Sequence, residues 1–79
     1  MDNLSRLQKA FGSALGIEPE KVHDDLSYGK DWDSVAHMNL VAEIESTFDV
    51  MFATEDVIDM STFAKAKEIV LKHGVDLSA

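Results

Sequence analysis

Apolar residues recur at helical spacing in three separate stretches of this 79-residue chain, and no other feature restricts its fold as strongly. The stretches run from Leu4 to Leu15, over residues 34–48 and from Phe63 to Val70. Because positions three and four apart lie on one side of an α-helix, each stretch is predicted to form an amphipathic helix facing a shared core. The predicted core positions are Leu4, Leu7, Ala10, Phe11, Ala14, Leu15, Leu40, Val41, Ile44, Phe48, Phe63, Ala66, Ile69 and Val70.

Residue types that favour helix ends border these stretches. Either Asp2 or Asn3 is expected to cap the first helix, which Gly16 ends. Either Ser61 or Thr62 is expected to cap the last helix, because a short hydroxyl side chain can accept a hydrogen bond from the first turn. The three stretches are therefore predicted to be separate helices.

A fourth, shorter helix is predicted between the second and third stretches. Thr54 is expected as its N-cap, with Glu55 and Asp56 in the first turn and Ile58 near its end. Acidic residues suit a first turn because the helix dipole is positive there.

Over residues 17–33 the helical period disappears, and Pro19, Gly29 and several acidic residues predict a long loop. Scattered apolar residues should hold the loop against the core: Ile17, Val22, Leu26, Tyr28 and Trp32. No alternation typical of a strand is present. We therefore predict a small all-α four-helix bundle, with three main helices, one short helix and a long first loop, forming a single domain over residues 1–79.

The composition is acidic, with fifteen Asp and Glu residues against seven Lys and Arg and a formal net charge of -8. This charge repels nucleic acid and anionic membranes and favours a protein partner with a basic surface. The chain has no cysteine, its three histidines are far apart, and no apolar run is long enough to span a membrane. Its first residues lack the pattern of a signal peptide. We expect a monomeric, cytoplasmic protein without a bound metal.

Asp33-Ser34-Val35 marks the junction between the acidic loop and the second predicted helix. A serine at a helix start presents its hydroxyl to solvent, beside backbone N–H groups that have no partner within the helix. These groups and the helix dipole stabilise an attached phosphate by about 0.3–1 kcal/mol. Ser34 is therefore a candidate attachment point for a phosphate-linked group, and Asp33 is an expected helix cap.

The second predicted helix carries two apolar ridges. Besides the core stripe, Val35, Met38 and Ala42 form a second ridge, with Glu45 and Asp49 close to it. The second ridge packs against the third helix or fills a gap beneath the loop, as an apolar stripe usually does, or it binds a partner protein reversibly. The acidic rim favours a basic partner.

The order of these elements around Asp33-Ser34-Val35 resembles that of the acyl carrier protein family over nearly the whole chain. The family has Asp-Ser-Leu at this place, so Val35 is a conservative exchange. Further agreement lies in Leu40, Ile44, Glu45 and the turn Phe48-Asp49-Val50. The motif is short, and its position within an acidic four-helix pattern gives it specificity.

The resemblance implies that Ser34 carries 4'-phosphopantetheine, which a phosphopantetheinyl transferase takes from coenzyme A with the help of Asp33. The chain would then be a non-catalytic carrier of acyl or aminoacyl thioesters for enzymes of fatty acid, polyketide or specialised acyl biosynthesis. It also implies an interior cavity between helices, and partner enzymes with basic docking surfaces. The implied partner contacts are Val35, Met38, Ala42, Glu45, Asp49, Glu55 and Asp56.

Three positions depart from fatty-acid-type carriers, which often have acidic residues where this chain has Ala36, Asn39 and Ser46. The second helix is therefore less acidic than in those carriers. This difference favours a dedicated set of enzymes over the housekeeping fatty acid synthase.

Other functions remain as alternatives. The chain is either a modified carrier or an unmodified carrier-fold adaptor or regulatory domain that binds a basic protein through its second ridge. Asp33, Ser34 and His37 superficially resemble a catalytic triad, but one helical turn hardly supplies an oxyanion hole and a cleft. His37 is expected to be a structurally satisfied histidine, with a contact to the prosthetic arm as the alternative. Trp32 is expected to pack against the loop and the first helix, with a place beside the arm as the alternative.

Overall fold

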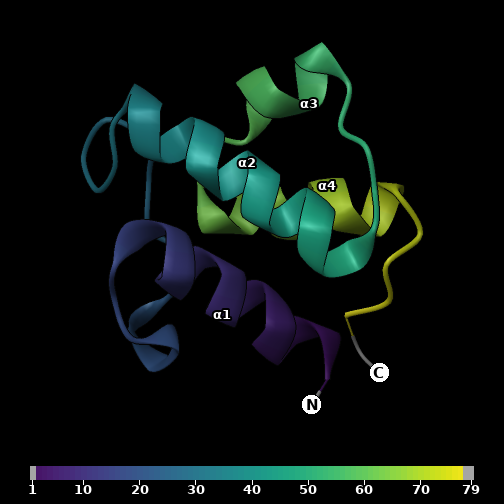
Figure 1. Ribbon diagram of the computed structural model, residues 1–79, viewed down its shortest axis with the longest axis horizontal. Coiled ribbons are helices and arrows are strands. Elements are labelled where there is room, and N and C mark those ends of the chain that lie inside the picture. The colour runs from purple at the N-terminus through teal and green to yellow at the C-terminus, as the bar shows by residue number, and fades with distance from the viewer. Residues whose placement is uncertain (1, 78–79) are drawn as a thin grey trace.

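The computed structural model describes residues 2–77. Within that range the chain forms α1 (Asn3–Leu15), η1 (Pro19–Lys21), α2 (Ser34–Phe48), α3 (Thr54–Asp59) and α4 (Phe63–Lys72), where η1 is a single 3₁₀ turn. Figure 1 shows α1 beside α2, the short α3 on the other side of α2, and α4 crossing behind. The predicted all-α architecture, with three longer helices, one short helix and a long first loop, is confirmed.

The N-caps of α1 and α4 are formed by one of the two candidates at each end. The Asp2 carboxylate accepts a hydrogen bond from the Ser5 N–H (2.7 Å). The Thr62 hydroxyl accepts one from the Lys65 N–H (3.0 Å). In both cases the capping side chain satisfies a donor that the first helical turn leaves without a partner.

The start of α3 differs from the prediction. Thr54 is not the cap, because Ala53 occupies the N-cap position and the Asp56 carboxylate accepts a hydrogen bond from the Ala53 N–H (3.1 Å). Asp56 is only 2% exposed, and its other contacts are Lys72 Nζ and His73 Nε2 (2.8 Å) at the end of α4. Hydrogen bonds from Lys72 and then His73 lower the pKa of Asp56 to about 2. One buried carboxylate therefore both caps α3 and ties it to α4.

The core lies where α1, α2 and α4 meet. Phe11 is at its centre, with its ring edge-to-face against Phe63 (centroids 4.8 Å apart) and Trp32 (5.8 Å). Trp32 therefore packs against α1, as predicted. Most predicted stripe residues are buried, while Leu4, Ala14, Leu15 and Phe48 are partly buried. The buried apolar residues are Leu7, Ala10, Phe11, Val22, Leu26, Trp32, Leu40, Val41, Ile44, Phe52, Met60, Phe63, Ala66, Ile69 and Val70.

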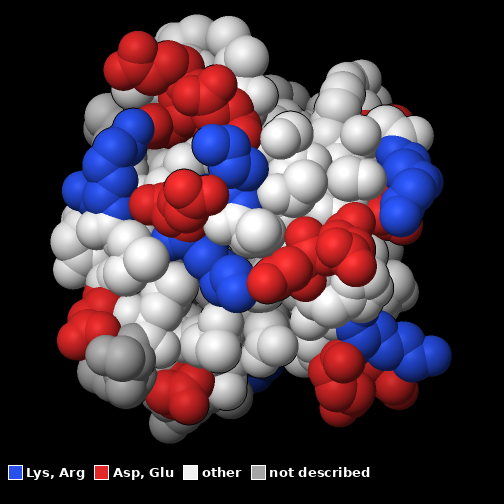
Figure 2. Space-filling model, turned by 180° about the vertical axis from the view of Figure 1, so that it is seen from behind, with Lys and Arg blue, Asp and Glu red and all other residues white. Residues whose placement is uncertain are grey.

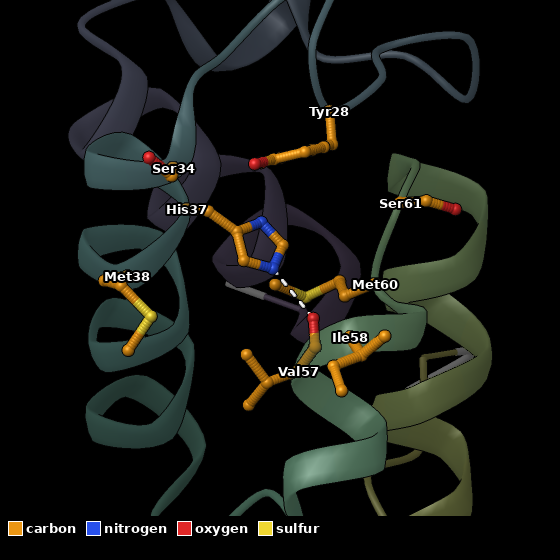
Figure 3. Close-up of a pocket in the computed structure, with 8 residues that line it drawn as sticks. All are labelled: Tyr28, Ser34, His37, Met38, Val57, Ile58, Met60 and Ser61. Atoms are coloured by element: carbon orange, nitrogen blue, oxygen red, sulfur yellow. Dashed lines mark hydrogen bonds between the residues drawn. The ribbon is translucent and has the colours of Figure 1, made fainter.

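Backbone hydrogen bonds hold the long loop against the connection between α3 and α4. The Tyr28 N–H donates to the Ser61 carbonyl (2.8 Å), and the Phe63 N–H donates to the Leu26 carbonyl (3.1 Å). These two hydrogen bonds fix the second half of the loop to Ser61 and Phe63. The loop thereby places Tyr28 beside the first turn of α2 (Figure 3).

Candidate functional site

The predicted attachment motif lies at the N-terminus of α2, as expected from the sequence. Asp33 is the N-cap, and its carboxylate accepts a hydrogen bond from the Ala36 N–H (2.9 Å). The Asp33 carbonyl accepts the first helical bond, from the His37 N–H (2.9 Å). Asp33 therefore fixes the direction in which the helix leaves the loop, and with it the position of Ser34.

Ser34 is exposed at this helix start, and no described residue forms a hydrogen bond with its hydroxyl. Figure 3 shows that the hydroxyl oxygen points away from the interior of the adjacent pocket. The backbone N–H groups of Ser34 and Val35 belong to the first turn of α2, which leaves them without helical acceptors. An oxygen-linked phosphate on Ser34 would meet these donors and the positive end of the α2 dipole.

A pocket of about 330 Å³ opens directly beside Ser34, between α2, α3 and the long loop (Figure 3). Its walls are mostly apolar, so it suits an apolar group better than a charged one. The lining residues are Tyr28, Ser34, His37, Met38, Val57, Ile58, Met60 and Ser61. The pocket lies between helices, as an interior cavity of the implied kind would, and it is open to the surface at Ser34.

His37 lies across this pocket and uses both ring nitrogens. Its Nδ1 accepts a hydrogen bond from Trp32 Nε1–H (2.9 Å), and its Nε2 donates to the Val57 carbonyl (2.8 Å). Because indole N–H groups only donate and carbonyls only accept, the neutral imidazole with its proton on Nε2 satisfies both partners. The expectation of a structurally satisfied histidine is confirmed, and neither nitrogen is available to activate Ser34 as a catalytic triad would require.

The second ridge of α2 is a free surface within the described chain. Val35 is 71% exposed, Met38 is 59% exposed, and Ala42 is also exposed. The interpretation in which these side chains fill a gap beneath the loop is therefore wrong. Ile58 of α3 is 73% exposed and lines the pocket together with Met38.

The structure exposes some of the predicted acidic contact residues and buries others. Asp49 and Glu55 are exposed. Glu45 is half-buried, and its carboxylate accepts a hydrogen bond from the Phe52 N–H (2.8 Å), so it braces the turn after α2. The expectation that Asp56 belongs to an exposed acidic patch is wrong, because its buried carboxylate is enclosed by α3 and α4.

The pocket walls were missed by sequence reasoning. Tyr28 comes from the loop, whereas Ile58, Met60 and Ser61 come from α3 and the segment after it. Helical period assigns residues to the side of one helix, but it does not report which side chains from different elements meet. The one available signal was a second apolar residue, Ile58, beside Val57 in a helix of only six residues.

The described residues show no competing metal or membrane site. No group of three or more His, Asp or Glu side chains within residues 2–77 is arranged to hold a metal ion. No helix in the same range has both the length and the apolar character needed to cross a bilayer.

Comparison with known proteins identifies the family of the chain. The family model "Phosphopantetheine attachment site" matches residues 5–69. The chain is also 35% identical over 63 residues to an acyl carrier protein of Phaeodactylum tricornutum (strain CCAP 1055/1), an alignment that covers 77% of this chain and 83% of the relative. Residues 5–69 therefore form a phosphopantetheine-attachment domain. The chain belongs to the acyl carrier protein family.

The cofactor of this family is 4'-phosphopantetheine. The residues at the start of α2 fit it, because an exposed hydroxyl, two first-turn N–H groups and an apolar pocket lie together there. The nearby carboxylate of Asp33 is turned toward the Ala36 N–H and accepts a hydrogen bond from it (2.9 Å).

Proposed function

We propose that this chain is a carrier of acyl or aminoacyl groups, with Ser34 as the attachment residue. The observation that carries the proposal is the exposed Ser34 hydroxyl at the N-terminus of α2, directly beside an apolar pocket. The group bound there supplies a thiol that holds the cargo as a thioester. In this proposal the protein positions and presents the cargo, and its own side chains catalyse no reaction.

Each residue of the attachment motif has a separate task in this proposal. Asp33 caps α2 and keeps Ser34 in the first turn. Ser34 provides the oxygen that forms the phosphodiester, while its own N–H and that of Val35 face the phosphate charge. We expect Asp33 also to help the loading transferase, by placing a carboxylate next to the reacting hydroxyl.

The docking surface in this proposal is the second ridge of α2 with its neighbours. Exposed apolar side chains next to the attachment residue offer contact area to any enzyme that receives the cargo. Val35, Met38 and Ala42 form its apolar part, and Asp49 and Glu55 its acidic part. Partner enzymes with basic surfaces, including a phosphopantetheinyl transferase, fit this distribution.

We propose a dedicated acyl pathway over housekeeping fatty acid synthesis. Ala36, Asn39 and Ser46 stand where fatty-acid-type carriers often have acidic residues. Asn39 and Ser46 are exposed, so their neutrality reduces the negative potential of the docking surface. The outward side of α2 therefore suits partners that rely more on apolar contact and less on charge.

The attachment residue is tested by intact mass. Purified protein is incubated with coenzyme A, magnesium and a broad-range phosphopantetheinyl transferase. We expect a mass increase of one phosphopantetheine in the native chain and none in Ser34→Ala. Ser61→Ala is the matched control, because Ser61 is another exposed serine at the same pocket and its loss should leave loading unchanged.

Two results would overturn this assignment. Loading of Ser34→Ala would place the attachment elsewhere. No loading of the native chain by several transferases would favour the alternative, an unmodified adaptor that binds a basic partner through Val35 and Met38, since both are exposed in the unmodified chain as well.

A further inference from the structure

His37 occupies an unusual place for a buried polar side chain, because it spans the gap between α2 and α3. Figure 3 shows the imidazole leaving α2 and reaching the Val57 carbonyl of α3 across the pocket beside Ser34. The Tyr28 ring lies edge-on to it, with centroids 5.2 Å apart. The ring is therefore held in one orientation by groups from α2, α3 and the loop.

On its other side the ring is held by Trp32, which is only 5% exposed. The indole of Trp32 is almost parallel to the imidazole (7° between the planes) and donates its N–H to Nδ1. A group that enters from the Ser34 side meets His37 first, and the ring cannot turn away without leaving the Trp32 donor and the Val57 acceptor unpaired.

We infer that His37 limits the depth of the pocket and so restricts the carried cargo to short acyl chains, which lie in front of the ring against Met38 and Ile58. This inference rests on the proposed carrier function. A longer apolar chain either stays in solvent beyond the mouth or displaces the ring and breaks both of its hydrogen bonds. His37 is in this sense a specificity-determining residue, which acts through its position between the helices.

The depth limit is tested without relying on any loading enzyme. The chain has no cysteine, so Ser34→Cys creates a single thiol at the attachment position. This thiol is alkylated with linear alkyl iodoacetamides of increasing chain length, and the midpoint of thermal unfolding is measured for each product. Each methylene that becomes buried should raise the midpoint by up to roughly 3–6 °C in a domain of this size.

With His37 present, we expect the midpoint to rise for the shortest chains and then to stay level as the chain lengthens. With His37→Val in the same background, we expect the rise to continue with chain length, because the smaller apolar side chain opens the way past the ring position. With His37→Gln, which fills similar space and keeps a donor and an acceptor, the plateau should return. Each alkylated protein is compared with its own unalkylated form, so the intrinsic stability of the variant cancels.

Trp32 gives a second measurement in the chain with native His37, since it is the only tryptophan and is hydrogen-bonded to the ring in question. Alkyl chains that remain in front of His37 should leave the emission wavelength of Trp32 unchanged. This readout stays available if His37→Val fails to fold. His23→Val is the matched control, because His23 is exposed and outside the pocket, and it should keep the plateau.

The inference is overturned if long chains continue to stabilise the protein with native His37, or if long chains shift its Trp32 emission. A plateau that persists in a folded His37→Val protein would also overturn it. Failure of transferase loading in the mass experiment would instead count against the carrier function. The two failures are therefore distinguishable.

Discussion

At the scale of single residues, Glu45 shows that an acidic side chain next to a docking surface can have a structural role. On the helical wheel it lies beside the docking ridge, yet its carboxylate accepts a hydrogen bond from the Phe52 N–H (2.8 Å) seven positions later. This contact fixes the turn in which Asp49 takes a left-handed backbone conformation (φ 53°). Substituting Glu45 therefore tests the turn more directly than it tests docking.

We expect Glu45→Ala to lower the free energy of unfolding by about 1–2 kcal/mol, because the Phe52 N–H loses a charged acceptor in a partly buried place. Urea unfolding followed by circular dichroism measures the change. Glu43→Ala is the control, since Glu43 is exposed on the same helix and its removal should stay within about 0.5 kcal/mol of the native value. Equal effects of the two substitutions would contradict the bracing role of Glu45.

Gly12 is a second residue whose role depends on its surroundings, because the backbone of Ile17 lies very close to its Cα. Its carbonyl accepts hydrogen bonds from the Gly16 N–H (2.8 Å) and the Ile17 N–H (3.0 Å), which end α1. A Cβ atom on Gly12 would lie 2.6 Å from the Ile17 carbonyl oxygen. The chain therefore turns back against α1 at a place where a side chain has no room.

In an unhindered helix, Gly→Ala stabilises by about 1 kcal/mol. At Gly12 we expect the opposite sign, with a loss of about 1–3 kcal/mol, because the clash is with backbone and not with a flexible side chain. Thermal unfolding of Gly12→Ala checks the sign. Ser13→Ala, at the exposed neighbouring position, should be neutral or slightly stabilising, and a stabilised Gly12→Ala would show that the turn relaxes freely.

At the scale of elements, α3 is the helix that the sequence describes least well. The three long helices follow from apolar spacing, because burial of one side is enough to define a helix of ten or more residues. Six residues are too few for that signal, and α3 is fixed mainly by side chains. His37 holds its Val57 carbonyl from α2, and Lys72 and His73 hold Asp56 from α4.

The position of the candidate attachment residue was predictable for a local reason, since Asp33 and Ser34 act within the first turn of α2. The pocket and the burial of Asp56 were not predictable. Lys72 and His73 lie sixteen and seventeen positions from Asp56, and no local pattern reports a partner at that separation. An acid in a helical first turn is ordinarily exposed, and only the packing of α3 on α4 shows that Asp56 is not.

The link between α3 and α4 should depend on pH in a defined direction. The pKa of Asp56 is lowered from 3.8 to about 2 in the folded protein, by Lys72 and His73. A carboxyl with a lowered folded-state pKa stabilises the fold above its ordinary pKa, and this contribution is lost as the pH falls through the folded value. The stabilisation that the Asp56 carboxylate gives should therefore be complete at neutral pH and weaken as the pH falls from 3.8 toward 2.

Asp56→Asn checks this dependence. We expect the native chain to unfold at a higher temperature than Asp56→Asn at neutral pH, with the difference shrinking as the pH falls toward 2. Asp59→Asn, an exposed position in the same helix, serves as the control and should follow the native curve. A difference between native and Asp56→Asn protein that stayed constant over the whole acid range would contradict this role of the Asp56 carboxylate.

At the scale of the whole molecule, acidic side chains outnumber basic ones, and the resulting negative charges repel one another. Figure 2 shows acidic side chains gathered in separate patches on one face, with Lys and Arg between some of them. Ion pairs join Lys67 to Asp24 (2.7 Å) and Lys30 to Asp31 (4.0 Å) near the surface. Fifteen acidic residues face only seven basic ones, so most carboxylates of the chain have no cation of their own.

Salt acts on these charges in two opposite ways. It screens the surface ion pairs, each of which contributes only about 0–1 kcal/mol, and it also screens the repulsion among eight net negative charges. The contact between Lys72 and the buried Asp56 is screened least. We therefore expect the loss of repulsion to outweigh the loss of the surface pairs, so that sodium chloride raises the midpoint of thermal unfolding at pH 7.

Differential scanning calorimetry from about 10 mM to about 300 mM salt measures the change, over a range in which the screening length falls from about 30 Å to under 10 Å. Sucrose at equal osmolality is the control for effects unrelated to charge. A flat or falling midpoint would show that the surface pairs matter at least as much as the repulsion, and that the acidic patches are already separated widely enough to be tolerated without a basic partner.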